Sequence, residues 1–140
     1  MKPWVSFAIL SMAFAGITSV IAKLGLAGIS GELGLLVRTG FVFLLIAGFA
    51  ALAVPVSDFA RLTPANYFWL GLSGLTTSVS WTFYYKALKD GEVSTIALID
   101  KGSILVAILL ACLVLKEQIT WRVAAGGFLM IAGILIIAKK

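Results

Sequence analysis

The sequence has no histidine and only one cysteine, Cys112. A catalytic triad built on histidine, a histidine metal site and an intrachain disulfide are therefore excluded. The motif GxxxxGK[ST], which binds nucleotide phosphates, does not occur either. We therefore expect neither an enzyme nor a protein that carries a metal or an organic cofactor.

Charged residues are also scarce. They make up 12% of the chain, whereas 61% of the residues are hydrophobic and the mean hydropathy is +1.12. A soluble domain needs roughly a quarter of its residues charged to cover its surface. The composition therefore predicts an integral membrane protein whose outer surface contacts lipid. The formal charge of +5 is spread along the chain without a basic run, so we expect no nucleic-acid partner.

Five apolar segments are long enough to cross a bilayer, whose ~30 Å core needs about 20 helical residues. They cover residues 4–22, 33–54, 65–85, 93–115 and 121–138. Ser30 and Glu32 are typical of the start of a helix, and Thr63-Pro64 suits the cap and first position of another. Short connections make neighbouring helices antiparallel. We predict an all-α, polytopic bundle of five transmembrane helices that forms one domain over residues 1–140.

The first segment has a second interpretation. Met1-Lys2, an apolar run and Ala13-Phe14-Ala15 resemble a signal peptide with its cleavage site. The apolar run continues beyond Ala15 to full spanning length, which favours a helix that is retained.

The loop cations are almost balanced between the two sides of the predicted bundle. Four lie on the side of the N-terminus: Lys2, Arg61, Lys116 and Arg122. Five lie on the opposite side: Lys23, Lys86, Lys89, Lys139 and Lys140. Because an excess of Lys and Arg on one side sets orientation, this chain carries almost no orientation signal. One interpretation is that copies insert both ways and pair as an antiparallel homodimer; the other is a single orientation set by another cue.

Three charged residues lie inside the predicted spans. Arg38, Asp100 and Lys101 fall ~7–12 Å below one membrane surface. Such charges cost several kcal/mol unless they are paired or hydrated, so we expect Arg38 to pair with Asp100 and Lys101 to reach a carbonyl or a ligand anion. Other polar or aromatic candidates at this level are Ser80, Trp81, Tyr84 and Ser103.

Two roles for this layer stay open. In the functional one, its residues bind a substrate or a coupling ion, and the extra positive charge favours a ligand with an anionic group. In the structural one, the Arg38–Asp100 pair fixes helix register and Lys101 extends toward the surface. Asp100, Ser103, Ala107 and Ala111 follow steps of three and four, so a continuous fourth helix would present them as one small or polar stripe.

Several short motifs resemble one known family. They are Tyr84-Tyr85-x-Ala87-Leu88, the run Leu115-Lys116-Glu117-Gln118-Ile119-Thr120, and the glycines Gly126-Gly127 and Gly133 of the last span. Their order and spacing resemble an EamA repeat of the drug/metabolite transporter superfamily. Lys23, Arg38, Tyr84 and Glu117 occupy family-like positions in that comparison. One departure is the absence of an early proline in the fourth span, where this chain has Asp100-Lys101-Gly102-Ser103.

The resemblance implies a function and an assembly. Members usually carry two such repeats and export small metabolites or drugs, so it implies a secondary carrier formed by two copies of this chain. Because five spans are an odd number, two paired repeats are inverted relative to each other. We also expect an inner (plasma) membrane location in a prokaryote and coupling to H⁺ or Na⁺, with Asp100 as the membrane-embedded carboxylate. The alternatives are a non-transport assembly or regulatory subunit and a lipid-linked sugar flippase.

Overall fold

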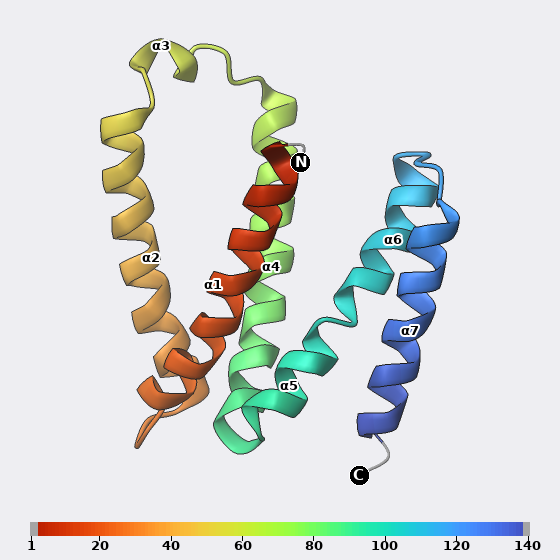
Figure 1. Cartoon of the computed structure of the whole chain (residues 1–140). Coiled ribbons are helices and arrows are strands. Elements are labelled where there is room, and N and C mark those ends of the chain that lie inside the picture. The colour runs from red at the N-terminus through yellow and green to blue at the C-terminus, as the bar shows by residue number, and fades with distance from the viewer. Residues whose placement is uncertain (1–2, 139–140) are drawn as a thin grey trace. The chain divides into compact units, whose positions relative to one another are not determined.

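The structure, a computed structural model, describes residues 3–138 (Figure 1). Every regular element in this range is helical, which confirms the predicted all-α class. The helices are α1 (Pro3–Gly25), α2 (Gly31–Ala53), α3 (Val56–Phe59), α4 (Pro64–Asp90), α5 (Val93–Asp100), α6 (Ser103–Val114) and α7 (Trp121–Ala138). The chain divides into two compact units, Val20–Asp90 and the remainder, which are described in turn.

The predicted caps of α2 and α4 are confirmed. The Ser30 hydroxyl accepts a hydrogen bond from the backbone N–H of Leu33 at 3.2 Å. Pro64 is the first residue of α4, and Thr63 and Asn66 cap its first turn reciprocally. The Thr63 N–H donates to Asn66 Oδ1 at 2.9 Å, and the Asn66 N–H donates to Thr63 Oγ1 at 3.3 Å. These bonds satisfy donors that a helix start leaves without an intrahelical partner.

Among residues 3–138, three helical segments are long and apolar enough to cross a membrane. They are Pro3–Gly25, Gly31–Ala53 and Val93–Val114, the last of which contains α5 and α6. The apolar part of α7, Trp121–Ile137, is shorter. The helix α4 has 27 residues, ~40 Å of rise, but is more polar because it carries several hydroxyl side chains.

Those hydroxyls bond within their own helix. Thr77 Oγ1 donates to the Ser73 carbonyl at 2.8 Å, and Ser78 Oγ donates to the Gly74 carbonyl at 2.9 Å. Thr82 Oγ1 does the same to the Ser78 carbonyl at 2.9 Å. A hydroxyl that bonds to a carbonyl one turn earlier needs no water. The polarity of α4 is therefore compatible with a low-dielectric surrounding.

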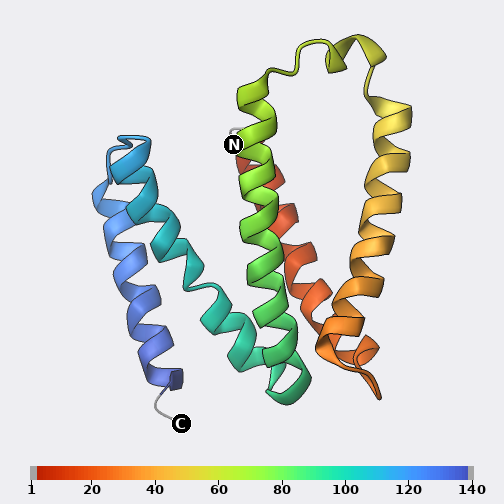
Figure 2. The same ribbon diagram turned by 180° about the vertical axis from the view of Figure 1, so that it is seen from behind.

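In the unit Val20–Asp90, α2 and α4 run in opposite directions and are joined by the short helix α3 (Figures 1 and 2). They come closest where α2 begins and α4 approaches its end. A Cβ built on Gly31 would lie 2.7 Å from the Tyr85 carbonyl oxygen, so only glycine permits this approach. The side chains of Leu26 and Leu88 are fully buried at the same end of the unit.

In the other unit, the segment Val93–Val114 has the length and apolar character of a membrane span, and a two-residue turn divides it into α5 and α6. The chain turns at Lys101 and Gly102 between α5 and α6. There the backbone bonds shorten to three residues: the Gly102 N–H donates to the Ile99 carbonyl at 2.9 Å and the Ile104 N–H to the Lys101 carbonyl at 3.1 Å. Of the predicted stripe, Asp100 ends α5, and Ser103, Ala107 and Ala111 lie on α6.

Glycine permits this turn although the chain has no proline there. A Cβ on Gly102 would lie 2.9 Å from the Ile99 carbonyl oxygen and 3.3 Å from the Cδ1 of Ile134 on α7. The helices α6 and α7 also approach near Gly127, whose built Cβ would lie 3.5 Å from Leu105 Cδ2. Gly102 therefore allows tight 3₁₀-type bonding close to a neighbouring helix.

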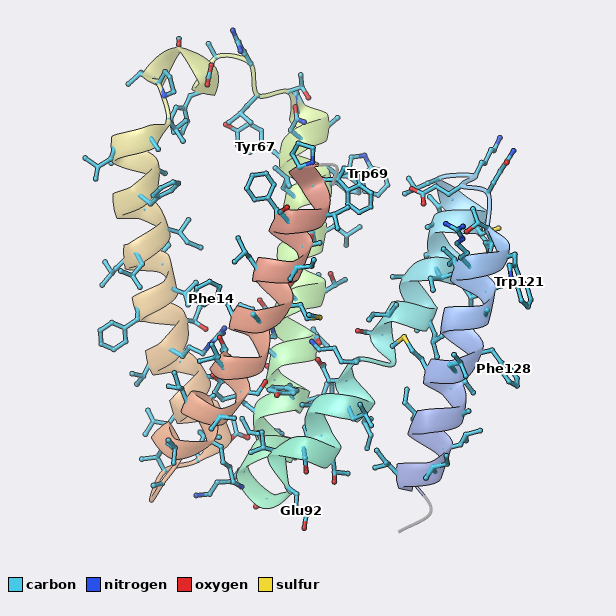
Figure 3. All side chains as sticks on the ribbon, viewed as in Figure 1. Phe14, Tyr67, Trp69, Glu92, Trp121 and Phe128 are labelled. Atoms are coloured by element: carbon cyan, nitrogen blue, oxygen red, sulfur yellow. The ribbon has the colours of Figure 1, made fainter. Side chains whose placement is uncertain are left out.

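Most large apolar side chains are exposed. Within residues 3–138, the buried large apolar side chains are Leu26, Tyr85 and Leu88. Figure 3 shows aromatic side chains that extend away from the ribbon; Phe14 and Trp121, for example, are 66% and 81% exposed. An apolar surface of this extent indicates a surrounding other than water.

Replacing Gly31 with alanine should destabilise the fold. The new methyl group would contact the Tyr85 backbone, which cannot move aside as a flexible side chain does, so we expect a loss of about 1–3 kcal/mol. Thermal unfolding of the purified protein in a mild detergent measures this. The matched control is Gly40→Ala on the same helix, where a Cβ meets nothing within 4 Å. Equal melting temperatures for the two variants would contradict the close approach.

Candidate functional site

A cation–aromatic cluster forms where α2 faces α4. The guanidinium carbon of Arg38 lies 4.3 Å from the centroid of the Trp81 ring and 5.9 Å from that of Tyr85. Such contacts contribute about 0.5–2 kcal/mol, more when water is excluded. The ion pairs within Val20–Asp90 are Arg61–Asp58 and Lys86–Glu32, so in this unit Arg38 is held by aromatic rings and by no carboxylate.

Tyr85 is the member of this cluster that sequence reasoning missed. Its side chain is only 4% exposed, and its hydroxyl oxygen is buried without a hydrogen-bond partner among residues 3–138. The predicted residue, Tyr84, is half-buried and packs edge-on against Tyr85 with ring centroids 6.2 Å apart. Helical spacing was the available signal, because positions 81 and 85 are four residues apart and share one face.

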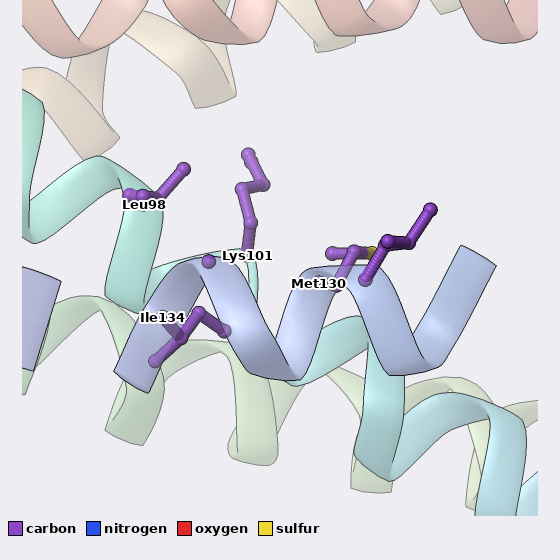
Figure 4. Close-up of a pocket in the computed structure, with 6 residues that line it drawn as sticks. Leu98, Lys101, Met130 and Ile134 are labelled. Atoms are coloured by element: carbon purple, nitrogen blue, oxygen red, sulfur yellow. The ribbon is translucent and has the colours of Figure 1, made fainter. Parts of the chain in front are cut away.

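Asp100 and Lys101 lie at the turn between α5 and α6. Lys101 Nζ is 3.7 Å from Asp100 Oδ2, and both side chains are partly exposed. Lys101 also lines a pocket of about 300 Å³ with Leu98 and the α7 residues Leu129, Met130, Gly133 and Ile134 (Figure 4). Arg38 belongs to the other unit, so the expected Arg38–Asp100 pair stays a prediction. Ser103 is exposed at the start of α6, and Ser80 is exposed on α4 beside Trp81.

Two lysines join the ends of α1 and α4. Lys23 Nζ, from the last turn of α1, donates to the carbonyls of Leu88 and Lys89 at 2.7 and 2.9 Å. Lys89 Nζ, from the last turn of α4, donates back to the Leu26 carbonyl at 3.1 Å. The C-terminal end of a helix carries partial negative charge and carbonyls without an intrahelical partner. Each lysine therefore caps the end of the other helix.

We call these reciprocal contacts of Lys23 and Lys89 the lysine clamp, and the surface around it is partly open. A pocket of about 390 Å³ is lined by Lys23, Leu24, Leu26, Ala27 and Lys89. Between α2 and α4, Lys86 Nζ lies 3.2 Å from Glu32 Oε1, and both side chains are more than half exposed. Exposed ion pairs contribute little to stability, so the lysine clamp contributes more than this pair.

Glu117 lies in the connection between α6 and α7. The preceding residue, Lys116, adopts a left-handed conformation with a φ of 56°, and the Glu117 N–H donates to the Ala111 carbonyl at 3.2 Å. This geometry ends α6 and turns the chain toward α7. The Glu117 side chain is exposed, so its observed contribution is the backbone bond that terminates the helix.

Comparison with known proteins identifies the family. The sequence signature of the EamA-like transporter family matches residues 2–139, nearly the whole chain. The chain belongs to the EamA-like transporter family. A Sinorhizobium sp protein named "Uncharacterized transporter in cobO 3'region" is 34% identical over 137 residues, which cover 98% of this chain and 97% of that relative. No solved structure matches the chain.

Membership confirms the resemblance and, with the apolar helices, makes this EamA-like chain an integral membrane protein of a transporter family. The turn between α5 and α6 forms at Lys101-Gly102, where this chain has no proline. Glycine and 3₁₀-type bonding produce the break at that position.

Replacing Lys23 with methionine should destabilise the protein. Methionine keeps an unbranched apolar stem but cannot donate to the Leu88 and Lys89 carbonyls, so we expect a loss of about 1–2 kcal/mol. Lys23→Arg should restore part of the loss because it keeps both charge and donors. Thermal unfolding in detergent, with the exposed Arg122→Met as control, measures the change. A Lys23→Met variant that melts with the wild type would contradict the clamp.

Proposed function

We propose that this chain is a half-unit of a secondary carrier for a small metabolite, and that two copies pair in opposite orientations in the inner membrane of a prokaryote. Two findings support a transporter: the family signature over nearly the whole sequence, and a relative of matching length whose name describes a transporter. For the half-unit, the central observation is that one match to the family signature covers residues 2–139, because the five proposed helices of that unit are few for a complete transport pathway.

The proposed carrier has five spans per copy, namely α1, α2, α4, the α5–α6 pair and α7. Length supports α4 as a span, since 27 residues exceed the about 20 needed to cross a bilayer core. Hydroxyls that bond to their own helix remove the main cost of placing α4 in hydrocarbon. For α7, the apolar run is 17 residues long, at the lower limit of spanning length.

Opposite insertion is supported by charge. Four loop cations on the side of the N-terminus face five on the other side, so neither orientation has a clear advantage. Because the number of proposed spans is odd, opposite insertion of two copies supplies the inversion that a fused pair of repeats has by connectivity. Alternating access then comes from rocking of two inverted units about a shared site.

The proposed substrate layer consists of Arg38 with Trp81, Ser80 and Tyr84, and of Asp100 with Lys101 and Ser103. The cation–π contact between Arg38 and Trp81 holds a cation in place within the helix pair. Asp100 lies at a helix break, where a carboxylate can exchange a proton or bind a cation, and we propose it for coupling to H⁺ or Na⁺. Arg38 and Lys101 together exceed Asp100 by one positive charge, which favours a substrate with an anionic group.

Reporter fusions to the C-terminus test the paired, inverted assembly. If copies insert both ways, a reporter that is active only in the cytoplasm and one that is active only outside the inner membrane should both give signal. Each signal should come from a substantial share of the copies. Charge variants sharpen the test. Ser57→Lys with Gln118→Lys should move the N-terminal side inward, whereas Arg61→Gln with Arg122→Gln should move it outward.

Both pairs of charge variants change exposed positions between α2 and α4 and around the start of α7, so they serve as matched controls for each other. A wild-type chain whose C-terminus gives signal on one side only, and whose orientation resists both pairs of substitutions, would contradict opposite insertion. That outcome would favour the non-transport subunit as the function.

Uptake into proteoliposomes tests the substrate layer. Screening anionic, zwitterionic and cationic metabolites should identify a substrate with a negative group. Arg38→Gln should then reduce uptake about a hundredfold, because it removes the charge-assisted contacts, and Asp100→Asn should abolish dependence on the ion gradient. Arg61→Lys, in the exposed connection between α3 and α4, keeps the loop charge and should leave uptake unchanged. If transport persists in folded Arg38→Gln and Asp100→Asn proteins, the layer has a structural role.

A further inference from the structure

We infer that Arg38 and the Tyr85 hydroxyl together bind a carboxylate group, so that the substrate is a small monocarboxylate with an apolar body. This inference deepens the proposed function and rests on it, because the bound carboxylate is a substrate only if the protein is a transporter. It adds one residue to the site, Tyr85, and narrows the ligand from any anion to a singly charged one.

The first step concerns the free edge of the arginine. A guanidinium group is planar, with its N–H donors in the plane, and its face stacks on aromatic rings. The Arg38 guanidinium carbon lies over the Trp81 ring, 4.3 Å from the ring centroid. Neither of the two ion pairs within Val20–Asp90 includes Arg38, so its in-plane N–H donors have no carboxylate acceptor in this unit. Donors in that geometry match the two oxygens of a carboxylate.

The second step concerns Tyr85. A buried hydroxyl without a hydrogen bond costs about 1–3 kcal/mol relative to a satisfied one, and native structures contain few of them. The Tyr85 side chain is 4% exposed, and its hydroxyl has no partner among residues 3–138. The same ring lies 5.9 Å from the Arg38 guanidinium carbon, so the unused donor belongs to the side chain next to the cation. An oxyanion bound at Arg38 supplies the acceptor that this hydroxyl needs.

The third step concerns charge and shape. Arg38 contributes one positive charge at a depth of ~10 Å, and the nearby Lys86–Glu32 pair is neutral as a whole. A carboxylate brings the charge to zero, whereas a phosphate dianion leaves a negative charge that is costly in this surrounding. The rings of Trp81 and Tyr85 provide apolar contact beside the charged group. Together these features favour a ligand that carries one negative charge and is otherwise apolar.

Trp81 can report binding directly. In a background with Trp4→Phe, Trp69→Phe and Trp121→Phe, the fluorescence of the purified full-length chain in detergent comes from Trp81 alone. Titration with hexanoate should change that fluorescence saturably, because the bound carboxylate shifts the guanidinium on the ring. Hexanamide has nearly the same shape without the charge, and it should give no saturable change.

Substitutions separate the two binding groups. Arg38→Gln should raise the dissociation constant for hexanoate about a hundredfold, and Tyr85→Phe about tenfold, because one charge-assisted hydrogen bond is lost. The control for tyrosine is Tyr67→Phe, an exposed residue near the start of the same helix, which should bind as the parent does. If the three tryptophan substitutions prevent folding, calorimetric titration of the otherwise native chain with the same pair of ligands gives the comparison.

Three results would overturn the inference: hexanoate and hexanamide binding alike, Tyr85→Phe binding hexanoate as tightly as the parent, or no saturable response to hexanoate. Binding without transport in proteoliposomes would instead overturn the proposed function and leave the carboxylate site intact. Transport of another class of substrate by a chain that does not bind hexanoate would overturn the carboxylate site alone.

Discussion

The constraint on which the rest of this structure depends is that hydrocarbon offers its helices no hydrogen bonds. Polar groups must therefore be satisfied within the chain. The hydroxyls of α4 bond one turn back along the same helix, and Lys23 and Lys89 donate to carbonyls at helix ends. Arg38 lies on an aromatic ring. The buried hydroxyl of Tyr85 is the exception among the described residues, because it has no hydrogen-bond partner, and it belongs to the α2–α4 cluster.

Much of the fold follows from local sequence chemistry. The caps at Ser30 and Thr63-Pro64 are set by residues within three positions, so a pattern-based reading placed both helix starts correctly. Features that depend on tertiary approach were missed. Gly102 is the single glycine of the apolar run 93–115. Its effect on the helix depends on tertiary contacts such as the close approach of Ile134 of α7, which the run itself does not reveal. The reciprocal lysine clamp joins residues more than sixty positions apart.

In the candidate site, too, some residues were predictable from local sequence and others depend on tertiary contacts. Arg38 was predicted because a charge is costly at membrane depth, and Trp81 because it lies at the same level as Arg38; the structure places the two side chains in contact. Sequence reasoning selected Tyr84 over Tyr85, because depth along a helix says little about which of two neighbouring residues points toward another helix. The face of α4 that meets α2 is fixed by the close approach of Gly31, and that approach buries Tyr85. A single glycine thus positions the aromatic residues against the arginine.

The central claim is that two copies of this chain function as an inverted pair, and covalent fusion tests it most directly. A direct tandem of two copies inverts the second copy because each contributes five spans, whereas one additional transmembrane helix in the linker makes the two copies parallel. The account predicts that the direct tandem unfolds at a higher temperature than the separate chains, since linked partners pair intramolecularly. The parallel tandem should show no such gain. Equal stabilisation of both tandems, or of neither, would contradict the inverted pair.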